Sequence, residues 1–375
     1  MADAGARRLV LPTDFADCEF ISISLVPMTD LDPASSDPGL TLVTGATGFV
    51  GAAVARALVR AGRRIRLIHR AQSDLSNLRD VPGERVVADL TDPASLAAAV
   101  AGCTRLFHVA ADYRLWVPDI AMMRRTNIDG SVALLKAAHA AGVKRMVYTS
   151  SVAALGLAQG REPANEGTAN RPEDHIGPYK RSKYDAEIAV RALAQAGLDI
   201  VIVNPSAPVG PGDIKPTPTG RMVLDAARGL MPAYVETGMN IVHVDDVAAG
   251  HLRAEQHGRT GESYILGGEN LMLSEIGQMI AKLAGRSPPR IKLPIAPLVP
   301  IARVMEGWAR LTGHPPMMTR DMLAMARHLM WYDSTKAVRE LGYAPRPAQR
   351  AFEDALVDFC KRGLLADIAF HPQAG

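Results

Sequence analysis

Strand-like and helical patterns alternate from residue 40 to about residue 205. Apolar runs typical of buried strands lie at 41–44, 64–69, 84–88, 104–110, 143–149 and 198–204. Between them, apolar residues recur with helical spacing at 49–61, 93–101, 119–141 and 178–196. Strands that alternate with helices are typical of a parallel sheet with helices on both faces. The pattern therefore predicts an α/β fold built on a doubly wound parallel sheet.

Beyond residue 205 the pattern becomes irregular. Prolines and glycines crowd residues 205–220, which predicts a loop. A strand and the start of a helix follow at 240–250, then a turn at Gly267 and Gly268, and helical patterns at 274–285, 298–312 and 319–330. We expect a larger domain, 40–205 plus about 236–270, and a smaller irregular region, 206–235 and 271–365. The smaller region would cover the carboxyl ends of the strands, where such sheets bind ligands.

Composition excludes several classes of protein. The 375 residues are 48% hydrophobic with a formal charge of +3, and no basic stripe suggests nucleic acid as a partner. Three scattered cysteines suit neither a disulfide framework nor a metal site, so we expect a cytoplasmic protein without a metal. No apolar run reaches the ~18 residues of a membrane-spanning helix. Residues 1–39 read as a disordered N-terminal extension, and translation from Met28 would leave the first strand intact.

Three glycines spaced three apart follow the first strand directly. Gly45, Gly48 and Gly51 occur in Thr-Gly-Ala-Thr-Gly-Phe-Val-Gly, which passes straight into an amphipathic helix. Such a turn exposes backbone N–H groups at a helix N-terminus, where the helix dipole favours a pyrophosphate. An ordinary turn is the simpler alternative, but the strand–turn–helix context favours a Rossmann fold that binds a dinucleotide.

Candidate chemistry lies near residue 180. Tyr179 and Lys183 are four residues apart, so a helix places them on one face. A cation close to a phenol favours the phenolate, which predicts a lowered pKa for Tyr179 and a role in acid/base catalysis. Two hydroxyls, Ser150 and Ser151, follow the strand at 143–149 and would lie at the carboxyl edge of the sheet. A chance surface pair and ordinary loop hydroxyls are the alternatives.

In this order and spacing, the motifs resemble those of the extended short-chain dehydrogenase/reductase family, over about residues 40–360. The resemblance implies a catalytic triad of Ser151, Tyr179 and Lys183. Three further sequence segments, at 109–116, 204–211 and 216–221, resemble those of one subgroup. That subgroup is the hopanoid-associated sugar epimerases, which are often described as dihydroflavonol 4-reductase-like. The family's reaction would be reversible hydride transfer between an NAD(P) cofactor and a carbon that bears oxygen.

The resemblance also implies a set of cofactor-binding residues. Thr44 matches the first residue of the cofactor loop, and Asn127 matches a shared, more structural asparagine. Asn204 and Pro205 match the turn that leads into the substrate region. The residues carried over to cofactor binding are Gly45, Thr47, Gly48, Phe49, Val50, Gly51, Asp89, Leu90, Ala110, Ala111, Lys183 and Pro205.

One departure bears on the choice of cofactor. An NAD-binding unit usually ends its second strand with an acid that holds the ribose 2′-hydroxyl. Here that strand ends in Ile68-His69-Arg70, and the next acid is Asp74. Arginine at this place can accept a 2′-phosphate. We therefore expect Arg70 to contribute to cofactor binding and NADP to be preferred over NAD.

Several questions remain open at the level of sequence. The substrate could be a nucleotide sugar, clasped by Lys215, Arg221 and Arg228, or a dihydroflavonol-like ketone, with Tyr113 and Trp116 lining its entrance. The same triad serves an epimerase, a dehydratase and a reductase. A catalytically silent NADP sensor or scaffold on this fold is the alternative from a different class.

Two expectations concern partners. Alanine stripes on the helices at 119–141 and 178–196, which pair across a two-fold axis in the family, suggest a homodimer. They comprise Ala133, Ala137, Ala140, Ala186, Ala189 and Ala192. The apolar segment 294–312, with few arginines, suits either contact with a bilayer surface or a lid or core helix, and its prolines and Glu306 favour the latter.

Overall fold

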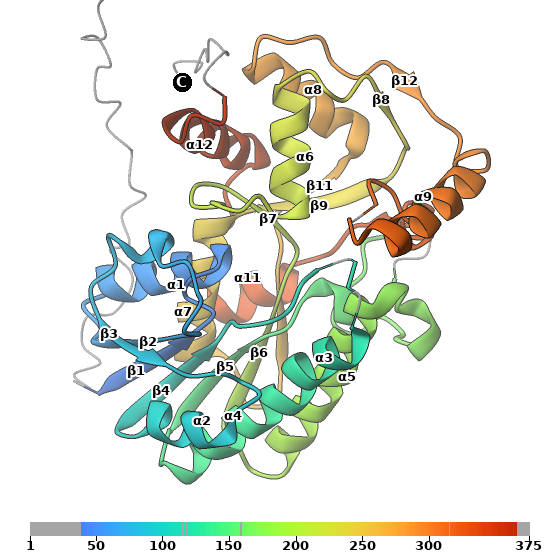
Figure 1. Ribbon diagram of the computed structural model, residues 1–375. Coiled ribbons are helices and arrows are strands. Elements are labelled where there is room, and N and C mark those ends of the chain that lie inside the picture. The colour runs from blue at the N-terminus through green and yellow to red at the C-terminus, as the bar shows by residue number, and fades with distance from the viewer. Residues whose placement is uncertain (1–38, 115, 118, 158–159, 315, 366–375) are drawn as a thin grey trace, which may run out of the picture. The chain divides into compact units, whose positions relative to one another are not determined.

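The computed structural model describes residues 39–365 except 115, 118, 158–159 and 315. The predicted extension at 1–39 therefore lies outside the described residues apart from Gly39. A parallel seven-stranded sheet organises the first part of the chain (Figure 1). Its strands, in spatial order, are β10 (Ser263–Leu266), β6 (Ile200–Pro205), β5 (Arg145–Thr149), β4 (Cys103–His108), β1 (Leu40–Thr44), β2 (Ile65–His69) and β3 (Glu84–Val87).

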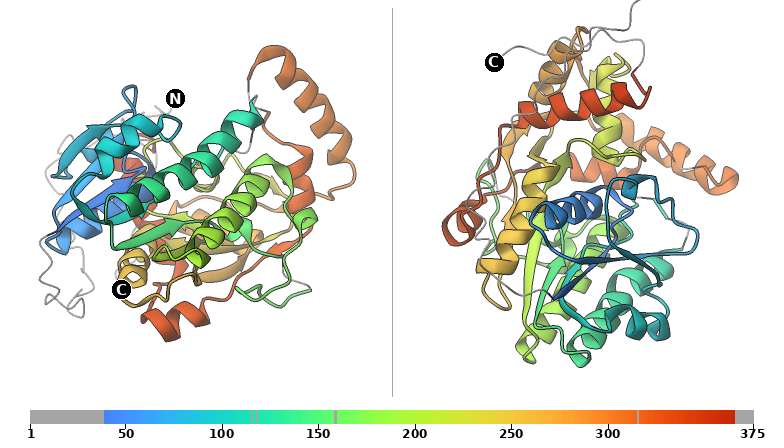
Figure 2. Two further views of the ribbon diagram at one scale, coloured as in Figure 1. Left: turned by 90° about the horizontal axis from the view of Figure 1, so that it is seen from below. Right: turned by 90° about the vertical axis from the view of Figure 1, so that its left-hand side faces the viewer.

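This strand order confirms the predicted fold. The chain runs outward from β1 to β3, then returns to β4 beside β1 and runs outward in the other direction. The order reverses between β1 and β4, and the crevice outside this point is where doubly wound sheets bind ligands. Helices cover both faces (Figures 1 and 2). One layer holds α1 (Phe49–Arg60), α7 (Val244–His257) and α11 (Thr335–Leu341), and the other holds α2 (Pro93–Val100), α3 (Ile120–Arg124), α4 (Gly130–Ala140) and α5 (Gly177–Gln195).

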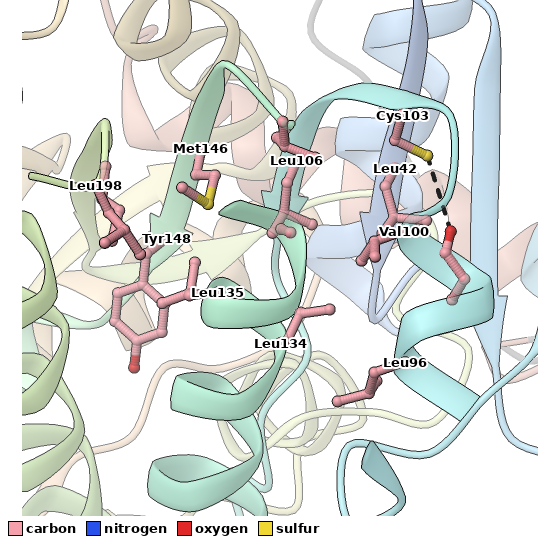
Figure 3. Packing of buried hydrophobic residues seen from close by; sticks show 14 of the residues in the cluster. Leu42, Leu96, Val100, Cys103, Leu106, Leu134, Leu135, Met146, Tyr148 and Leu198 are labelled. Carbon is pink, nitrogen blue, oxygen red and sulfur yellow. Dashed lines mark hydrogen bonds between the residues drawn. The ribbon is translucent and has the colours of Figure 1, made fainter. Parts of the chain in front are cut away.

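The core between the sheet and the second helix layer consists of fully buried aliphatic side chains (Figure 3). Leu106 and Met146 extend from adjacent strands towards Leu134 and Leu135 of α4. At ~25 cal/mol per Å² of apolar surface, this burial drives the docking of the layer. Ala133 and Ala137 also pack against this core, and Ala186 is 1% exposed within it. These alanines therefore fit helices closely to the sheet rather than forming an outer face.

A second sheet and its helices form the smaller region. The strands are β7 (Ala207–Val209), β9 (Gly238–His243), β11 (Glu269–Met272) and β13 (Leu329–Met330), with a separate pair β8 (Ala233–Tyr234) and β12 (Ile291–Lys292). Around the central strand β9 pack α6 (Pro218–Ala227), α8 (Leu273–Leu283) and α12 (Ala348–Lys361), through a core that includes Leu224, Ile280 and Phe352. The helices α9 (Leu298–Thr312) and α10 (Arg320–Met325) complete the region.

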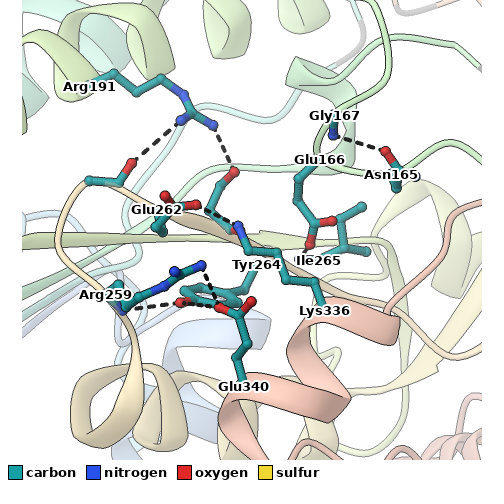
Figure 4. A network of polar contacts seen from close by, with 12 residues as sticks. Asn165, Glu166, Gly167, Arg191, Arg259, Glu262, Tyr264, Ile265, Lys336 and Glu340 are labelled. Carbon is teal, nitrogen blue, oxygen red and sulfur yellow. Dashed lines mark hydrogen bonds and ion pairs between the residues drawn. The ribbon is translucent and has the colours of Figure 1, made fainter.

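The edge strand β10 is fastened by polar side chains (Figure 4). Glu166 accepts a hydrogen bond from the backbone N–H of Ile265 at 2.8 Å. Lys336 of α11 donates to Glu262 at 2.7 Å and lies 4.7 Å from the ring centroid of Tyr264. Backbone groups at an exposed sheet edge invite unwanted pairing with other chains. These contacts cover the edge and attach α11 to it.

The sequence predicted the strands and helices of residues 40–205 to within about two residues, with one exception. The expected helix at 119–141 consists of α3, a π-helical turn at Arg125–Asp129, and α4. Asn127 lies in this turn and exchanges hydrogen bonds with the backbone of Asp112, at 2.7 Å from the Asp112 N–H and 2.9 Å to its carbonyl. Single π-turns of this kind frequently mark functional sites.

Two expectations for the second half were wrong. Residues 205–220 are not a loop throughout, because they contain β7 and the first turn of α6. The helix expected at 319–330 ends at Met325, because residues 329–330 pair with β9 instead. Of the segment 236–270, β10 joins the first sheet but β9 belongs to the second. Within the described residues, no helix has both the length and the apolar character needed to cross a membrane.

Candidate active site

The glycine turn lies at the point where the strand order reverses. Gly45 has a φ of +68°, and a Cβ on it would lie 2.7 Å from the backbone of Ala110, the residue that follows β4 by two. A Cβ on Gly51 would lie 2.1 Å from the carbonyl oxygen of Gly45. Both positions therefore need glycine for the strand, the turn and α1 to approach one another.

Gly48 differs from the other two. A Cβ on it would meet only the Gly45 oxygen, at 3.3 Å. Gly48 is also the N-cap residue of α1, where no side chain caps the helix and the first turn carries no acid. The uncapped N–H groups and the helix dipole favour an anion at this point. The cradle that glycine leaves here fits the pyrophosphate of a dinucleotide.

Asn77, a buried residue that the sequence did not single out, ties this turn to the smaller region. Its side-chain amide donates to the carbonyl oxygens of Gly48 at 3.3 Å and Gly212 at 3.1 Å. Arg56 of α1 reinforces the same contact by donating to the Asn77 carbonyl at 2.8 Å. Residues 210–213 are thereby held beside the glycine turn. A lone asparagine in a short 3₁₀ turn has no motif that would reveal this role.

Buried polar contacts support the ends of β1 and β4. Thr44 forms a hydrogen bond with His108 at 2.7 Å, and its hydroxyl accepts from the N–H of Ala110 at 3.1 Å. The other ring nitrogen of His108 lies 2.8 Å from the hydroxyl of Ser131 on α4. Burial, together with the nearby Lys183 charge, lowers the pKa of His108 to about 3, so its imidazole stays neutral. The cluster fixes the backbone of Ala110, one of the predicted cofactor contacts.

Ser151 and Tyr179 come together at the carboxyl end of β5. Ser151 caps the short 3₁₀ helix at Val152–Ala154 and accepts from the Ala153 N–H at 3.1 Å. Tyr179 lies in the first turn of α5, after Pro178. Burial raises the pKa of Tyr179, and a side-chain hydrogen bond with Ser151 opposes that rise. The phenol is therefore neutral at physiological pH and carries a proton that it can donate.

The expectation that Lys183 lowers the pKa of Tyr179 is wrong for this structure. Lys183 is buried on the same helix face, but its ammonium donates to the carbonyl of Thr149 at 2.9 Å and lies 5.1 Å from the ring centroid of Tyr148. Burial, opposed by the Glu187 charge, lowers the pKa of Lys183 to about 8. The ammonium is thus directed at the end of β5, and burial dominates the titration of Tyr179.

Glu187 lies four residues after Lys183, one helical turn further along the face of α5 that carries Tyr179 and Lys183. It is 5% exposed and accepts from Asn204 at 2.8 Å and from Arg191 at 2.8 Å. The Asn204 amide also donates to the Ser151 carbonyl at 3.1 Å. Glu187 therefore helps to keep Lys183 protonated and fixes the backbone of Ser151. Extending the i, i+4 series along the sequence would have identified it.

Arg70 lies exposed at the end of β2, as predicted. Among the described residues its guanidinium forms no hydrogen bond or ion pair, but its charge contributes to the lowered pKa of Asp89, behind the hydrogen bonds from Thr91. The Arg70 charge also contributes slightly to the lowered pKa of Asp112, where burial acts to raise the pKa. Arg70 is thus close to Asp89, the predicted adenine contact, with its donors free to bind an anion.

The cations proposed to clasp a diphosphate do not gather. Lys215 pairs with Asp74 at 3.5 Å, and Arg221 pairs with Asp225 at 3.0 Å. Arg228 donates to the carbonyl of Leu364 at 2.8 Å. Tyr113, by contrast, is 46% exposed. Partial burial raises its pKa, and the nearby charges of Asp213 and Asp112 raise it further. No diphosphate clasp is formed by these three side chains.

The comparisons with known proteins agree with this geometry. Residues 41–267 match the model of the NAD dependent epimerase/dehydratase family. The chain is 44% identical to a putative dihydroflavonol 4-reductase of Synechocystis sp. over 86% of this chain and 94% of that protein. It is 36% identical to sterol demethylase protein B of Methylococcus capsulatus, over 87% of this chain and 99% of that protein. The crystal structure of gox2253 is similar with a TM-score of 0.79 and 54% sequence identity, over 87% of this chain and 99% of the gox2253 chain.

The glycine residues offer a matched pair of tests. We expect Gly51→Ala to lower the melting temperature, because its Cβ would overlap the Gly45 carbonyl and such overlap costs about 1–3 kcal/mol. Gly48→Ala should leave the melting temperature nearly unchanged and weaken NADPH binding, measured by fluorescence titration. Equal melting temperatures for the two variants would contradict this division of roles.

Asp213 should make stability depend on pH. Burial raises its pKa to about 6, although Thr217 donates to it. The folded protein therefore holds this proton more tightly than the unfolded chain, and stability falls as the pH rises from about 4 to 6, by up to ~1.4 kcal/mol per pH unit. Asp213→Asn should flatten urea-unfolding free energies over this range. An unchanged slope would show that another group titrates.

By these matches, the chain belongs to the NAD dependent epimerase/dehydratase family, the extended short-chain dehydrogenases/reductases, and is an NAD(P)-binding enzyme of the oxidoreductase type.

Proposed function

We propose that the protein is an NADPH-dependent reductase of an apolar ring ketone. The observation that carries the proposal is the Ser151–Tyr179 pair at the carboxyl end of β5, with the Tyr179 pKa raised by burial. Reduction of a ketone needs a proton donor at the developing alkoxide. A phenol that keeps its proton at physiological pH is suited to that direction of the reaction.

The side chains divide the work as follows. Ser151 holds the carbonyl oxygen of the substrate, and Tyr179 donates its proton to that oxygen. The bound nicotinamide supplies the hydride. Lys183, fixed by the Thr149 carbonyl and helped to stay protonated by the charge of Glu187, provides a cation at the end of β5. As an ammonium donor, it also suits the ribose hydroxyls of the nicotinamide half.

The cofactor would lie along the carboxyl edge of the first sheet. Its pyrophosphate would bind at Gly45, Thr47, Gly48, Phe49, Val50 and Gly51, and its adenine beside Asp89 and Leu90. Ala110, Ala111 and Pro205 would border the nicotinamide half. Arg70, whose guanidinium faces no ion-pair partner within the described part of the chain, would bind the 2′-phosphate of NADP.

The substrate class rests on two observations. Lys215, Arg221 and Arg228 each have another partner, which disfavours the diphosphate of a nucleotide sugar. The relatives named above refer to a dihydroflavonol and to a sterol, both of them multi-ring compounds without a phosphate. Tyr113 and Trp116 follow β4 and would border such a substrate.

A homodimer remains a prediction. The alanine stripes that suggested it are partly used for packing, since Ala186 is 1% exposed in the core and Ala133 and Ala137 pack against it. A two-fold interface would therefore use the exposed residues of α4 and α5 instead.

The first test of the reaction is replacement of the proton donor. Tyr179→Phe should reduce ketone turnover by about 10²–10⁴-fold and leave NADPH affinity unchanged, because only the phenol oxygen is lost. Tyr184→Phe, on the same helix and stacked on His175, is the matched control and should keep its activity. The rate of reduction by the native enzyme should stay level below about pH 8 and fall above it, because Lys183, with a pKa of about 8, then loses its charge while Tyr179 remains protonated.

Lys183→Met should abolish turnover as well, whereas Lys180→Met removes a similarly buried lysine whose pKa is also about 8 and should be tolerated. Substrates for these assays are a dihydroflavonol and a ketosteroid, with UDP-glucose as the contrasting probe. Turnover of UDP-glucose alone, or full activity of Tyr179→Phe, would overturn the proposed function.

The second test addresses the cofactor. If Arg70 binds the 2′-phosphate, NADPH should bind about 10–100-fold more tightly than NADH, because a charge-assisted hydrogen bond contributes ~1.5–3 kcal/mol. Arg70→Ala should remove most of this preference without weakening NADH binding. Arg79→Ala, an exposed arginine beyond the same strand, serves as control. NADH affinity equal to that of NADPH in the native protein would contradict the assignment.

A further inference from the structure

The helix α9 exposes its apolar side chains instead of burying them. Ile301, Val304, Trp308 and Leu311 are 50%, 73%, 68% and 84% exposed. Their spacing of three, four and three residues places them on one stripe of the helix. The sequence had favoured a lid or core helix here, but the buried residues of α9 are Ala302, Glu306 and Ala309. The face turned to the protein is small and acidic, and the apolar face is turned outward.

Glu306 fixes this orientation. Its carboxylate is 6% exposed and accepts hydrogen bonds from the backbone N–H of Arg320 at 2.7 Å and from the Arg320 guanidinium at 2.9 Å. Because a buried carboxylate is costly without its partners, α9 cannot turn its other face inward without breaking both contacts. In Figure 1 and in both views of Figure 2, α9 lies at the margin of the smaller region.

Two arginines line one flank of the exposed stripe, in a segment of net positive charge. Arg303 and Arg310 lie on α9 itself, seven residues apart and therefore on one flank of the stripe. Across residues 286–330 the only acids are Glu306, which is paired, and Asp321, whereas the basic residues are Arg286, Arg290, Lys292, Arg303, Arg310, Arg320 and Arg327. The net charge of this segment alone, +5 from these residues, exceeds the +3 of the whole chain. The remainder of the protein is therefore slightly acidic.

We propose that α9 docks the protein onto an anionic bilayer surface. An exposed apolar stripe with tryptophan and leucine, flanked by arginines, is the pattern of a helix that lies in the membrane interface. The basic residues match the negative charge of the lipid headgroups. A protein partner would also cover the apolar stripe, but Arg303 and Arg310 on its flank and the net positive charge of residues 286–330 favour an anionic surface.

Docking at this place would bring lipid close to the reaction site. The carboxylate of Asp321 in α10 lies against Gly177, where a Cβ would be 3.1 Å from it, at the start of α5. Tyr179 follows two residues later. The pair α9–α10 therefore lies beside the end of α5 that carries the proton donor, and an apolar substrate could pass from the bilayer without crossing open water. The docking itself stands on α9 and does not depend on the proposed reaction.

Vesicle flotation with the full chain, without cofactor or substrate, tests the proposal. The native protein should float with phosphatidylcholine vesicles that contain 30% phosphatidylglycerol, and binding should fall at least tenfold on pure phosphatidylcholine or in 0.5 M salt. The fluorescence of Trp308 should shift to the blue on binding, and this shift should disappear in Trp308→Ser. The shift assigns the contact to α9 rather than to another surface.

Two variants separate the contributions of charge and apolar contact. Arg303→Glu with Arg310→Glu should weaken binding to anionic vesicles at least tenfold and leave the weak binding to neutral vesicles unchanged. Trp308→Ser with Leu311→Ser should weaken both by about tenfold or more. The control is Val338→Ser with Arg339→Glu on α11, where both residues are also exposed, and it should bind like the native protein.

Circular dichroism melts and NADPH titration establish that each variant is folded, so loss of vesicle binding is read separately from loss of the enzyme. Binding that the α9 variants do not alter, or no binding to anionic vesicles by the native protein, would overturn the proposal. Light scattering provides the remaining outcome. A native dimer that becomes monomeric in Trp308→Ser with Leu311→Ser would show that the stripe joins two copies of the chain, which also overturns it.

Discussion

The contact between the glycine turn and its surroundings is the constraint on which the site depends. Gly51 allows α1 to approach the Gly45 carbonyl, and Gly45 allows the turn to lie against Ala110 at the end of β4. Without these approaches, the uncapped N-terminus of α1 would not point into the crevice between β1 and β4. Asn77 then joins the same turn to Gly212. One set of close backbone contacts thus positions both the N-terminus of α1 and the smaller region beside it.

Desolvation, more than charge pairing, determines the chemistry at this edge of the sheet. Burial keeps His108 neutral and keeps the proton on Tyr179, while it lowers the pKa of Lys183 to about 8. The charge of Glu187 opposes the lowering of the Lys183 pKa. The buried carboxylate of Glu187 therefore counteracts the loss of the Lys183 proton.

The sequence predicted the repeating part of the molecule well because its signals are local. Period-two and period-3.6 patterns, and glycines that follow a strand, are properties of neighbouring residues, and they located β1 to β6, α1, α2 and α5. The site residues at the ends of these elements follow from the topology. The direction of the Lys183 ammonium does not follow, because it depends on the Thr149 carbonyl, 34 residues away in sequence. The same holds for Asn77, whose partner at Gly212 is 135 residues distant, and for the short strands of the second sheet.

The helix α9 also shows that local sequence signals do not predict long-range contacts. Its residues favoured a lid or core helix over contact with a bilayer, because apolar composition does not reveal which side of a helix is covered. Only the long-range pair of Glu306 with Arg320 determines that the acidic face is turned inward and the tryptophan outward. A sequence that places a carboxylate inside and Trp308 in the solvent accepts an exposed apolar surface, which soluble proteins rarely keep without a use. The two arginines along its flank and the net positive charge of residues 286–330 indicate that use.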